Sequence, residues 1–503
     1  MTIPALLGID LGTSQVKAGL IGLDGRLLAL ARAGYPTTTD HDATATASGE
    51  ASEQDPVDWW AAIRSVIAEL LSTAGSTDGP LEIRAIGLAG QGPTLVCADA
   101  DGAPIGPAMT WLDRRTAAED AELTAATGEA GWVLGILPKA LWAERHRPAV
   151  RIEARWYLAS WEWLGLRLSG VAAETTMPGQ VHPDAHAVAR TGLRTDRIPP
   201  RVAAGTVLGP LLKDRAAELG LNPAVPVVAG MVDAHASILG AGLLEPGDAI
   251  DTGGTSGGFA VYTDRPIDVP GVFSAAAPIP GRWFLGGAMN ATGKALDWLA
   301  EDVLRGTIPT DTLVAEALDC PAGADGLVFL PYLAGERSPI WDPTARGAFV
   351  GLTLRHGRAQ LVRAVLEAAD LAVRHVAAPI LEAGLAVTEL RVSGGMANGS
   401  TQASAQGTAR NRLKADVTGF TVAVPAVVET AVVGSAIAAG TGIGAFPDFA
   451  SGCRALVRIV ERIEPDPAER ATYDALYERY AALYPALRPT FERLGRIGPK
   501  GAQ

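Results

Sequence analysis

The sequence predicts an α/β protein made of two halves of similar size, and three observations lead to this prediction. Segments with the composition of buried strands alternate along the chain with segments of helical periodicity, as in α/β folds. The strand–turn–strand pattern of residues 6–23 returns in residues 249–262 with nearly the same turn, which indicates an internal duplication. The length of 503 residues also exceeds what one core usually supports, at about 100–200 residues per domain.

The first half is expected to begin with a hairpin and to continue with alternating helices and strands. Its strands are expected at apolar runs bounded by turn residues: 6–10, 16–23, 81–89 and 225–231. Its helices are expected where apolar residues recur at helical spacing: 58–71 and 156–168. Residues 37–52, rich in Thr, Ala and Ser, are expected to form an exposed loop.

The boundary between the halves is expected in the Pro–Gly turn of residues 242–248, which divides the chain into 1–246 and 247–503. The second half begins with the repeated hairpin. The uncharged run 430–447 is too short and too rich in small residues for a comfortable membrane span, so we expect a buried helix and turn there. Residues 468–494 are expected to form a helix.

Composition excludes several classes of partner. Acidic side chains outnumber basic ones by 55 to 42, which gives a formal net charge of −13. The sequence contains no block of Lys and Arg, and this argues against nucleic acid or an anionic membrane as a partner. The cysteines, Cys97, Cys320 and Cys453, form neither a disulfide framework nor a metal knuckle. The N-terminus lacks a signal-peptide pattern. These features predict a cytoplasmic protein with no nucleic-acid or membrane partner, and they leave a homodimer open.

Two turns, one in each half, combine an Asp with Gly, Thr and Ser. Asp10 precedes the turn 11–14, and Asp251 precedes the turn 252–256. Backbone N–H groups and hydroxyls in such a bend can face a phosphate chain, while the carboxylate holds a hydrated Mg²⁺. One such turn is equally well an ordinary hairpin, but a copy in each half favours a nucleotide bound by two domains.

The apolar run 225–231 is followed by Asp233 and His235, directly before a helix of small residues. Open α/β sheets bind ligands at this end of their strands. An Asp at this position can act as the general base that accepts a hydroxyl proton as the oxygen attacks a γ-phosphate. The alternative is a purely structural helix cap.

A second cluster, His182, Asp184 and His186, places three candidate metal ligands at alternate positions. Pro183 interrupts any strand there, and no fourth ligand cluster follows in sequence. A solvated loop is therefore preferred, and a metal-dependent hydrolase is kept as a minor alternative.

Taken together, these motifs resemble the FGGY family of carbohydrate kinases, most closely its xylulokinase branch, over almost the whole chain. Residues 9–14 are similar to the first phosphate motif of the family, and residues 138–146 to its first signature, with departures at Ile136 and Ala143. The second signature is matched at every position by residues 347–367. Residues 52–60 and 329–338 resemble segments of xylulokinases.

The resemblance implies two actin-like (ribonuclease H-like) domains with an interdomain cleft for ATP and a sugar. It implies that Asp233 is the catalytic base and that Asp10 organises Mg²⁺ through water. The implied nucleotide contacts are Asp10, Thr13, Ser14, Gly254, Thr255, Gly293, Asp297, Gly395 and Asn398. The implied acceptor contacts are Gln91, Trp111, Asp113, Arg114 and His235. The implied reaction is phosphorylation of a primary hydroxyl of a sugar, most closely a ketopentose such as xylulose.

Two departures from the xylulokinase pattern concern the sugar side. Xylulokinases place Met-His-Gly after the first sugar-loop Gln, where this chain has Gly92 and Pro93, and Asn after the catalytic Asp, where it has Ala234. A hydroxyl left without a partner costs about 1–3 kcal/mol, enough to change preference between stereoisomers. Ribulose, a tetritol or a glycerol-like polyol are therefore alternative acceptors. A non-sugar actin-fold ATPase is an alternative from another class, although a switch protein needs no acid at the sugar-side strand end.

Overall fold

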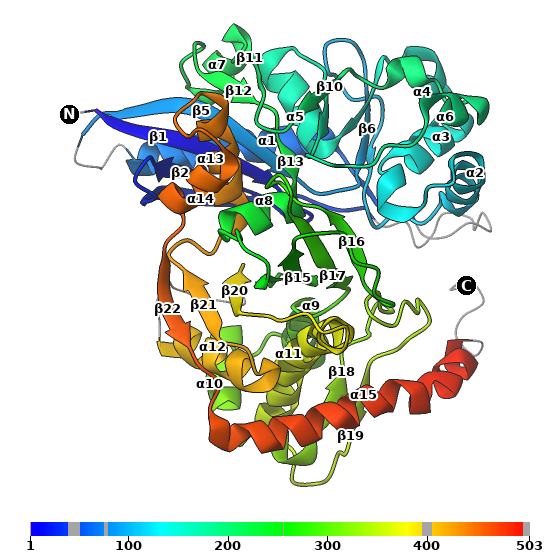
Figure 1. Cartoon of the computed structure of the whole chain (residues 1–503), viewed down its shortest axis with the longest axis vertical. Coiled ribbons are helices and arrows are strands. Elements are labelled where there is room, and N and C mark those ends of the chain that lie inside the picture. Colours follow the sequence, from blue (N-terminus) through cyan, green and yellow to red (C-terminus); the bar gives the residue numbers. More distant parts are fainter. Residues whose placement is uncertain (1, 39–50, 75–78, 255, 395–404, 496–503) are drawn as a thin grey trace. The chain divides into compact units, whose positions relative to one another are not determined.

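The computed structural model describes residues 2–38, 51–74, 79–254, 256–394 and 405–495. The chain forms two compact units. Unit 1 consists of Met1–Gly242, Pro278–Pro280 and Thr430–Val457, and unit 2 of Leu243–Ala277, Gly281–Glu429 and Arg458–Gln503. Both units mix helices with a central sheet, which confirms the predicted α/β class (Figure 1).

The central sheet of unit 1 has the strand order β11-β12-β5-β1-β2-β3, with β13 also paired to β5. Its strands are β1 (Ile3–Leu11), β2 (Gln15–Gly22), β3 (Leu27–Gly34), β5 (Leu81–Gly90), β11 (Val207–Pro210), β12 (Pro226–Val228) and β13 (Met231–Val232). The first three form an antiparallel meander, and β5 runs parallel to β1. The predicted N-terminal hairpin is confirmed, whereas the run 225–231 is divided between two short strands.

The central sheet of unit 2 repeats this topology. Its strand order is β16-β17-β15-β14-β20-β21-β22. The strands are β14 (Asp248–Thr252), β15 (Gly257–Thr263), β16 (Phe273–Ala276), β17 (Trp283–Met289), β20 (Glu389–Ser393), β21 (Val422–Pro425) and β22 (Ile459–Ile463). As in unit 1, an antiparallel meander is followed by two parallel strands and a final antiparallel one. The predicted duplication therefore extends from the turn sequences to the order of most strands in the sheet. The sheets differ at their edges, because β16 lengthens the meander of unit 2, and β22 follows β21 in the chain whereas β11 precedes β12.

Helix α1 (Pro56–Ala74) and helix α13 (Thr430–Gly442) pack against opposite faces of the sheet in unit 1. Leu7 and Ile9 of β1 belong to the hydrophobic cluster that contains the apolar face of α1. Gly8, between them, points the other way, since successive residues of a strand face opposite sides. A Cβ at Gly8 would lie 2.2 Å from the carbonyl oxygen of Val432. The small residues of α13 thus allow its backbone to approach the sheet closely (Figure 1).

One segment packs with residues on the other side of the expected division at residues 246/247. The segment 430–457, which the linear division assigns to the second half, belongs to unit 1. It contains α13 and α14 (Phe449–Leu456). Both helices follow residues of unit 2 in the chain, and the composition of the sequence does not change where the chain returns to unit 1.

A second layer of unit 1 surrounds a small sheet of strand order β4-β7-β6-β8. Its strands are β4 (Glu53–Gln54), β6 (Leu95–Ala98), β7 (Ala108–Met109) and β8 (Trp156–Ala159). The other elements of unit 1 are α2 (Ala117–Thr127), η1 (Gly131–Leu134), α3 (Leu137–His146), α4 (Pro148–Glu153), α5 (Ser160–Ser169), β9 (Glu174–Thr176), α6 (Ala185–Arg190), η2 (Thr195–Arg197), β10 (Arg201–Ala203), α7 (Lys213–Leu219) and α8 (Asp233–Gly240). The helix expected over 156–168 begins only at Ser160, because the preceding residues pair with β6.

Unit 2 carries the longest helices. They are α11 (Arg358–Glu382) and α15 (Pro467–Gly495), and the shorter elements are α9 (Lys294–Trp298), η3 (Leu299–Val303), α10 (Thr310–Leu318), η4 (Ala324–Gly326), β18 (Val328–Leu330), β19 (Ala348–Val350) and α12 (Ala405–Thr418). The predicted C-terminal helix is confirmed as α15. Across the described ranges, every helix is too short or too polar to cross a bilayer.

Candidate functional site

Asp10 and Asp233 lie at the same end of the central sheet of unit 1. Asp10 of β1 and Met231 of β13 are both in register with Ala89 of β5. The strands β1 and β13 therefore flank β5, about 10 Å apart at the usual strand spacing. Asp233 follows β13 directly as the first residue of α8. The carboxyl ends of the strands thus place two acids beside each other, as the sequence predicts for a ligand-binding edge.

The two carboxylates of this edge influence each other electrostatically. Burial, and next the negative charge of Asp10, raise the pKa of Asp233 to about 7, although the N–H of Ala234 and the charge of Lys17 act in the opposite direction. One oxygen of Asp233, Oδ1, accepts a 2.8 Å hydrogen bond from that N–H. Because Val232 occupies the N-cap position, Asp233 is not the cap of α8.

Tyr35 also belongs to this edge, and the sequence analysis did not identify it. Its hydroxyl donates a hydrogen bond to the carbonyl of Gly12 in the first phosphate turn. Burial and the charges of Asp10 and Asp233 raise the pKa of Tyr35 well above its ordinary value. The phenol therefore stays neutral and ties the turn to the end of β3.

The first phosphate turn is held by two further side chains of unit 1. The Gln54 amide donates to the carbonyl of Thr13 at 2.6 Å, and the Trp111 indole donates to the Thr13 hydroxyl at 2.9 Å. Gln91, fully buried at the end of β5, donates to the side-chain carbonyl of Gln54 at 2.7 Å. Two predicted acceptor residues, Gln91 and Trp111, are therefore physically connected to the predicted phosphate turn. Ser14 is exposed at the tip of this turn.

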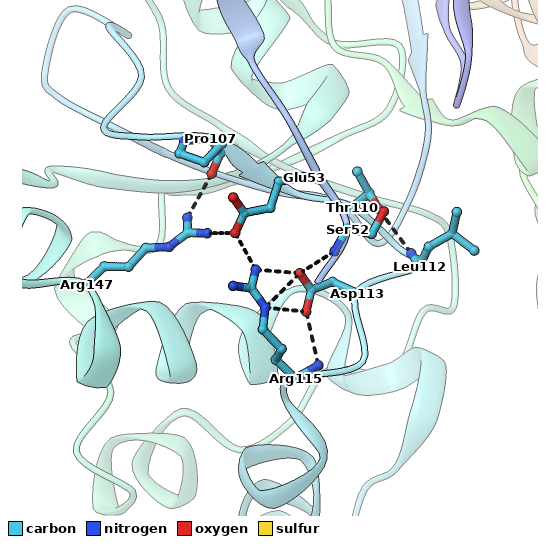
Figure 2. Close-up of polar contacts among 8 residues, drawn as sticks. All are labelled: Ser52, Glu53, Pro107, Thr110, Leu112, Asp113, Arg115 and Arg147. Atoms are coloured by element: carbon cyan, nitrogen blue, oxygen red, sulfur yellow. Dashed lines mark hydrogen bonds and ion pairs between the residues drawn. The ribbon is translucent and has the colours of Figure 1, made fainter. Parts of the chain in front are cut away.

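Asp113 is buried and its carboxylate is bound by Arg115, as Figure 2 shows. The Arg115 guanidinium contacts both Asp113 oxygens, at 3.1 Å through Nε and 2.6 Å through Nη2. The backbone N–H of Ser52 donates to the same carboxylate at 3.1 Å. Arg114, which the sequence analysis named, is exposed. Both carboxylate oxygens of Asp113 therefore accept hydrogen bonds within the protein. The guanidinium group that binds them is that of Arg115, not that of Arg114.

The Arg115 guanidinium is itself part of a larger cluster around β4 (Figure 2). Glu53 accepts hydrogen bonds from both Arg115 and Arg147. The Trp142 ring of α3 lies 4.4 Å from the Arg115 guanidinium carbon and 5.6 Å from that of Arg147. These contacts fix the segment between Trp111 and Arg115, which joins the small sheet to α2.

The second phosphate turn, in unit 2, has a different charge environment from the first. Lys414 of α12 donates to Asp251 and, at 2.5 Å, to Asp370 of α11. Arg410 makes two further bonds to Asp370, at 2.5 and 3.0 Å. All four side chains are buried. Asp251 is therefore neutralised by a lysine, whereas Asp10, its counterpart in the duplication, raises the pKa of a neighbouring acid, Asp233.

The other predicted nucleotide residues are only partly described. Gly254 lies in the turn after β14, and Gly293 precedes the first residue of α9. Asp297 is exposed on α9. Thr255, Gly395 and Asn398 lie outside the described residues.

Comparison with known proteins agrees with this arrangement in both units. The profile of the FGGY family of carbohydrate kinases, N-terminal domain, matches residues 5–240, and that of the C-terminal domain matches residues 251–443.

The chain belongs to the FGGY family of carbohydrate kinases.

Three relatives illustrate the range of this carbohydrate kinase family. A xylulose kinase of Escherichia coli K12 is 32% identical over 387 residues, which cover 73% of this chain and 77% of that protein. A gluconokinase of Bacillus subtilis 168 is 26% identical over 461 residues, 86% of each chain. The crystal structure of a xylulose kinase from Rhodospirillum rubrum is 32% identical, has a TM-score of 0.76 and covers 97% of this chain and 100% of that chain. The expected pair of actin-like domains is confirmed.

Within this kinase, packing accounts for one departure from the xylulokinase pattern. A Cβ at Gly92 would lie 2.8 Å from the Trp161 ring and 3.1 Å from a methyl group of Val232. A residue with a side chain therefore does not fit here unless Trp161 moves. The other departure, Ala234, is exposed on α8, and His235, the residue after it, is buried.

The metal-hydrolase alternative finds no support in the kinase fold. In the parts of the chain that the structure describes, no group of three or more His, Cys, Asp or Glu side chains could hold a metal ion. His182 lies 3.9 Å from Glu174, and Asp184 caps α6 by accepting the Ala187 N–H at 2.7 Å. His186 is exposed. These three residues therefore have ordinary surface and capping roles.

The sequence analysis did not identify the residues that fix the predicted site residues in position through hydrogen bonds and ion pairs. Gln54 and Glu53 lie in a segment noted only for its resemblance, and Arg115 was passed over for its neighbour. Lys139 of α3 is buried as well, and burial lowers its pKa to about 8 although the charge of Asp113 acts in the other direction. In the sequence, the one indication that Lys139 is buried was its position in the segment that resembles the first family signature.

Proposed function

We propose that this carbohydrate kinase transfers the γ-phosphoryl group of ATP to a primary hydroxyl of a ketopentose or a related polyol, with Asp233 as general base. The observation that carries the proposal is the position of Asp233 beside Asp10 at the carboxyl end of the sheet in unit 1. The xylulose kinases among the relatives favour a ketopentose, and the gluconokinase keeps a sugar acid as a second candidate.

A carboxylate with a pKa near 7 suits this role better than an ordinary aspartate. At neutral pH about half of Asp233 is ionised, and its basicity lies close to the operating pH, where general-base catalysis is most efficient. In the proposed step the acceptor oxygen attacks the γ-phosphorus, its proton passes to Asp233, and the bond from phosphorus to the ADP oxygen breaks. Because Oδ1 already accepts the Ala234 N–H, we assign the proton to Oδ2.

Asp10 provides the carboxylate that we propose for Mg²⁺, through water. Carboxylate oxygens are the hard ligands that Mg²⁺ prefers, and the effect of Asp10 on the pKa of Asp233 supports a carboxylate close to the proposed base. A bound Mg²⁺ neutralises charge on the transferring phosphate. Tyr35 and Lys17 lie near the two acids. Neither side chain is a carboxylate, so we propose no Mg²⁺ contact for them.

The remaining contacts are proposed by position. Thr13 and Ser14 form the phosphate turn of unit 1, and we propose the following nucleotide contacts in unit 2: Gly254, Thr255, Gly293, Asp297, Gly395 and Asn398. On the acceptor side we propose Gln91, Trp111 and His235 as direct contacts. Asp113 is better placed to orient the Trp111 segment through Arg115 than to bind a hydroxyl, since its oxygens are occupied.

The proposal is tested by ADP release from Mg·ATP across ketopentoses, ketohexoses, pentitols, tetritols, glycerol and aldonic acids. We expect turnover with at least one acceptor and a loss of several orders of magnitude in Asp233→Asn. Asp214→Asn, at an exposed position of α7, serves as the matched control. ADP release that is independent of any acceptor, or an Asp233→Asn variant that keeps near-normal turnover, would overturn the proposal.

A further inference from the structure

Unit 1 contains a cavity of about 360 Å³, and His235 is the one proposed acceptor contact among its lining residues. Its wall is formed by η1 and the start of α3, by β8 and α5, by the segment from β9 to α6, and by the junction of β13 and α8. All of the lining residues belong to unit 1.

The cavity adjoins the proposed reaction centre. Val232 and His235, on either side of Asp233 in sequence, both line it. Pro93, two residues after Gln91, lines it as well. A molecule that presents a hydroxyl to Asp233 therefore has the cavity as the space for the rest of its chain.

Most of the wall is apolar or aromatic. Its largest such side chains are Trp132, Ile136, Trp161, Met177, Ile198 and Met231. A wall of this composition favours carbon over hydroxyl groups, because each apolar group that leaves water for it gains free energy.

Several polar side chains of the wall are already bonded within the protein. Glu162 accepts hydrogen bonds from the N–H groups of Ala159 and Thr175, both at 2.8 Å. The Thr175 hydroxyl accepts the Trp161 indole N–H at 2.6 Å. Glu174 is paired with Arg201 at 2.8 Å. A hydroxyl that entered this wall would lose its water partners and find few replacements.

The volume is that of an ordinary small-molecule pocket. About 360 Å³ lies within the range of about 300–1,000 Å³ in which such pockets fall, so the cavity has room for more of an acceptor than the hydroxyl that it presents to Asp233.

We propose that the acceptor is a sugar or polyol whose end remote from the phosphorylated hydroxyl is apolar, such as a deoxy, methyl-branched or alkyl-substituted chain, and that this cavity holds that end. The proposal rests on the proposed function, since it assigns the substrate class of the same site. The hydroxylated end faces Asp233 and the Gln91 loop, and the apolar end contacts Trp161 and Met177.

The first experiment compares ketopentoses with their 1-deoxy and 1-O-alkyl analogues by ADP release with Mg·ATP. We expect kcat/KM to be at least tenfold higher for an analogue than for its parent sugar. Calorimetric titration without ATP gives a second measurement, in which the analogue should bind with a more negative heat-capacity change, the mark of apolar burial.

A variant that narrows the cavity gives the matched test. Ala185 lines the cavity at an exposed position of α6, and Ala189 is exposed on the same helix outside it. Ala185→Trp should raise KM for the analogue at least tenfold and leave KM for ATP unchanged, whereas Ala189→Trp should change neither.

The outcomes separate this inference from the proposed function. No acceptor-dependent ADP release with any compound overturns the proposed function and the inference with it. Release with a ketopentose that is equal to or faster than with its analogues, and unaffected by Ala185→Trp, overturns the inference alone and leaves the kinase assignment in place.

Discussion

The charge of Asp233 is predicted to destabilise the free enzyme at alkaline pH, so Asp233→Asn should be more stable than the parent while losing turnover. Burial and the charge of Asp10 raise the pKa of Asp233 to about 7 in the folded protein. In the unfolded chain the same group has an ordinary pKa of about 3.9. Asn occupies the same volume and carries no charge at any pH.

The sign follows from proton binding. Between about pH 4 and pH 7 the folded state holds a proton on Asp233 and the unfolded state does not, so the stability of the parent falls as pH rises through this range. The stability that this group contributes at low pH is lost once pH exceeds about 7. The variant lacks this dependence, and its advantage should therefore grow with pH and level off near pH 8.

The magnitude follows from the size of the pKa change. A shift of about three units corresponds to about 4 kcal/mol at pH 8, at about 1.4 kcal/mol per unit, and to about 1–2 kcal/mol at pH 5. The Asp10 share can be judged separately. Two charges about 10 Å apart interact by about 1.7 kcal/mol at an effective dielectric constant of about 20, so Asp10→Asn should give roughly a third to a half of the gain.

The assay is urea unfolding of the nucleotide-free enzyme at pH 5 and pH 8, for the parent, Asp233→Asn and the control Asp214→Asn. We expect the difference in unfolding free energy between parent and Asp233→Asn to increase by about 3 kcal/mol from pH 5 to pH 8. The reasoning is refuted if that difference is the same at both pH values, or if the control shows the same increase.

Three further predictions follow from buried contacts. Arg115→Met leaves the buried Asp113 carboxylate without its guanidinium partner. It should destabilise unit 1 by about 3 kcal/mol and raise KM for the acceptor but not for ATP in the ADP-release assay, whereas Arg26→Met, at an exposed position of unit 1, should do neither. Lys414→Met removes the cation that Asp251 and Asp370 share, and should lower the free energy of unfolding in urea by about 3–5 kcal/mol. A loss of less than about 1 kcal/mol would contradict this prediction. Gly240→Ala places a Cβ 1.8 Å from the Thr430 carbonyl oxygen and should lower the melting temperature sharply, whereas Gly209→Ala, with open space at its Cβ, should leave it nearly unchanged in a thermal scan.

Local patterns were enough to predict much of this protein. The N-terminal hairpin, α1 and α15 each follow from the spacing of apolar residues within one segment. The duplication was visible because the two Asp-containing turns repeat in sequence, and the structure extends it to the order of strands in both sheets. The family resemblance, likewise, depends on short motifs whose residues are neighbours in the chain.

Predictions that depended on position in space were less complete. The expected helix over 156–168 loses its first four residues to β8 because they pair with β6, a strand some 60 residues earlier in the chain. That Arg115 binds the Asp113 carboxylate was not predicted, because sequence does not tell which of two adjacent guanidinium groups turns inward. The contacts of Asp113 and Arg114 with an acceptor stay predictions.

The sequence by itself determined the family, the two hairpins and the acid at the end of the strand before α8, because each is encoded by residues within one turn or one strand. The tertiary structure decided the rest: that α13 packs with unit 1, that Lys414 neutralises Asp251 while Asp10 raises the pKa of Asp233, and that a cavity lies beside Asp233. These outcomes depend on which distant side chains share a buried volume. Close packing and the cost of an unpaired buried charge select that arrangement, and neither is visible in the periodicity of a single segment.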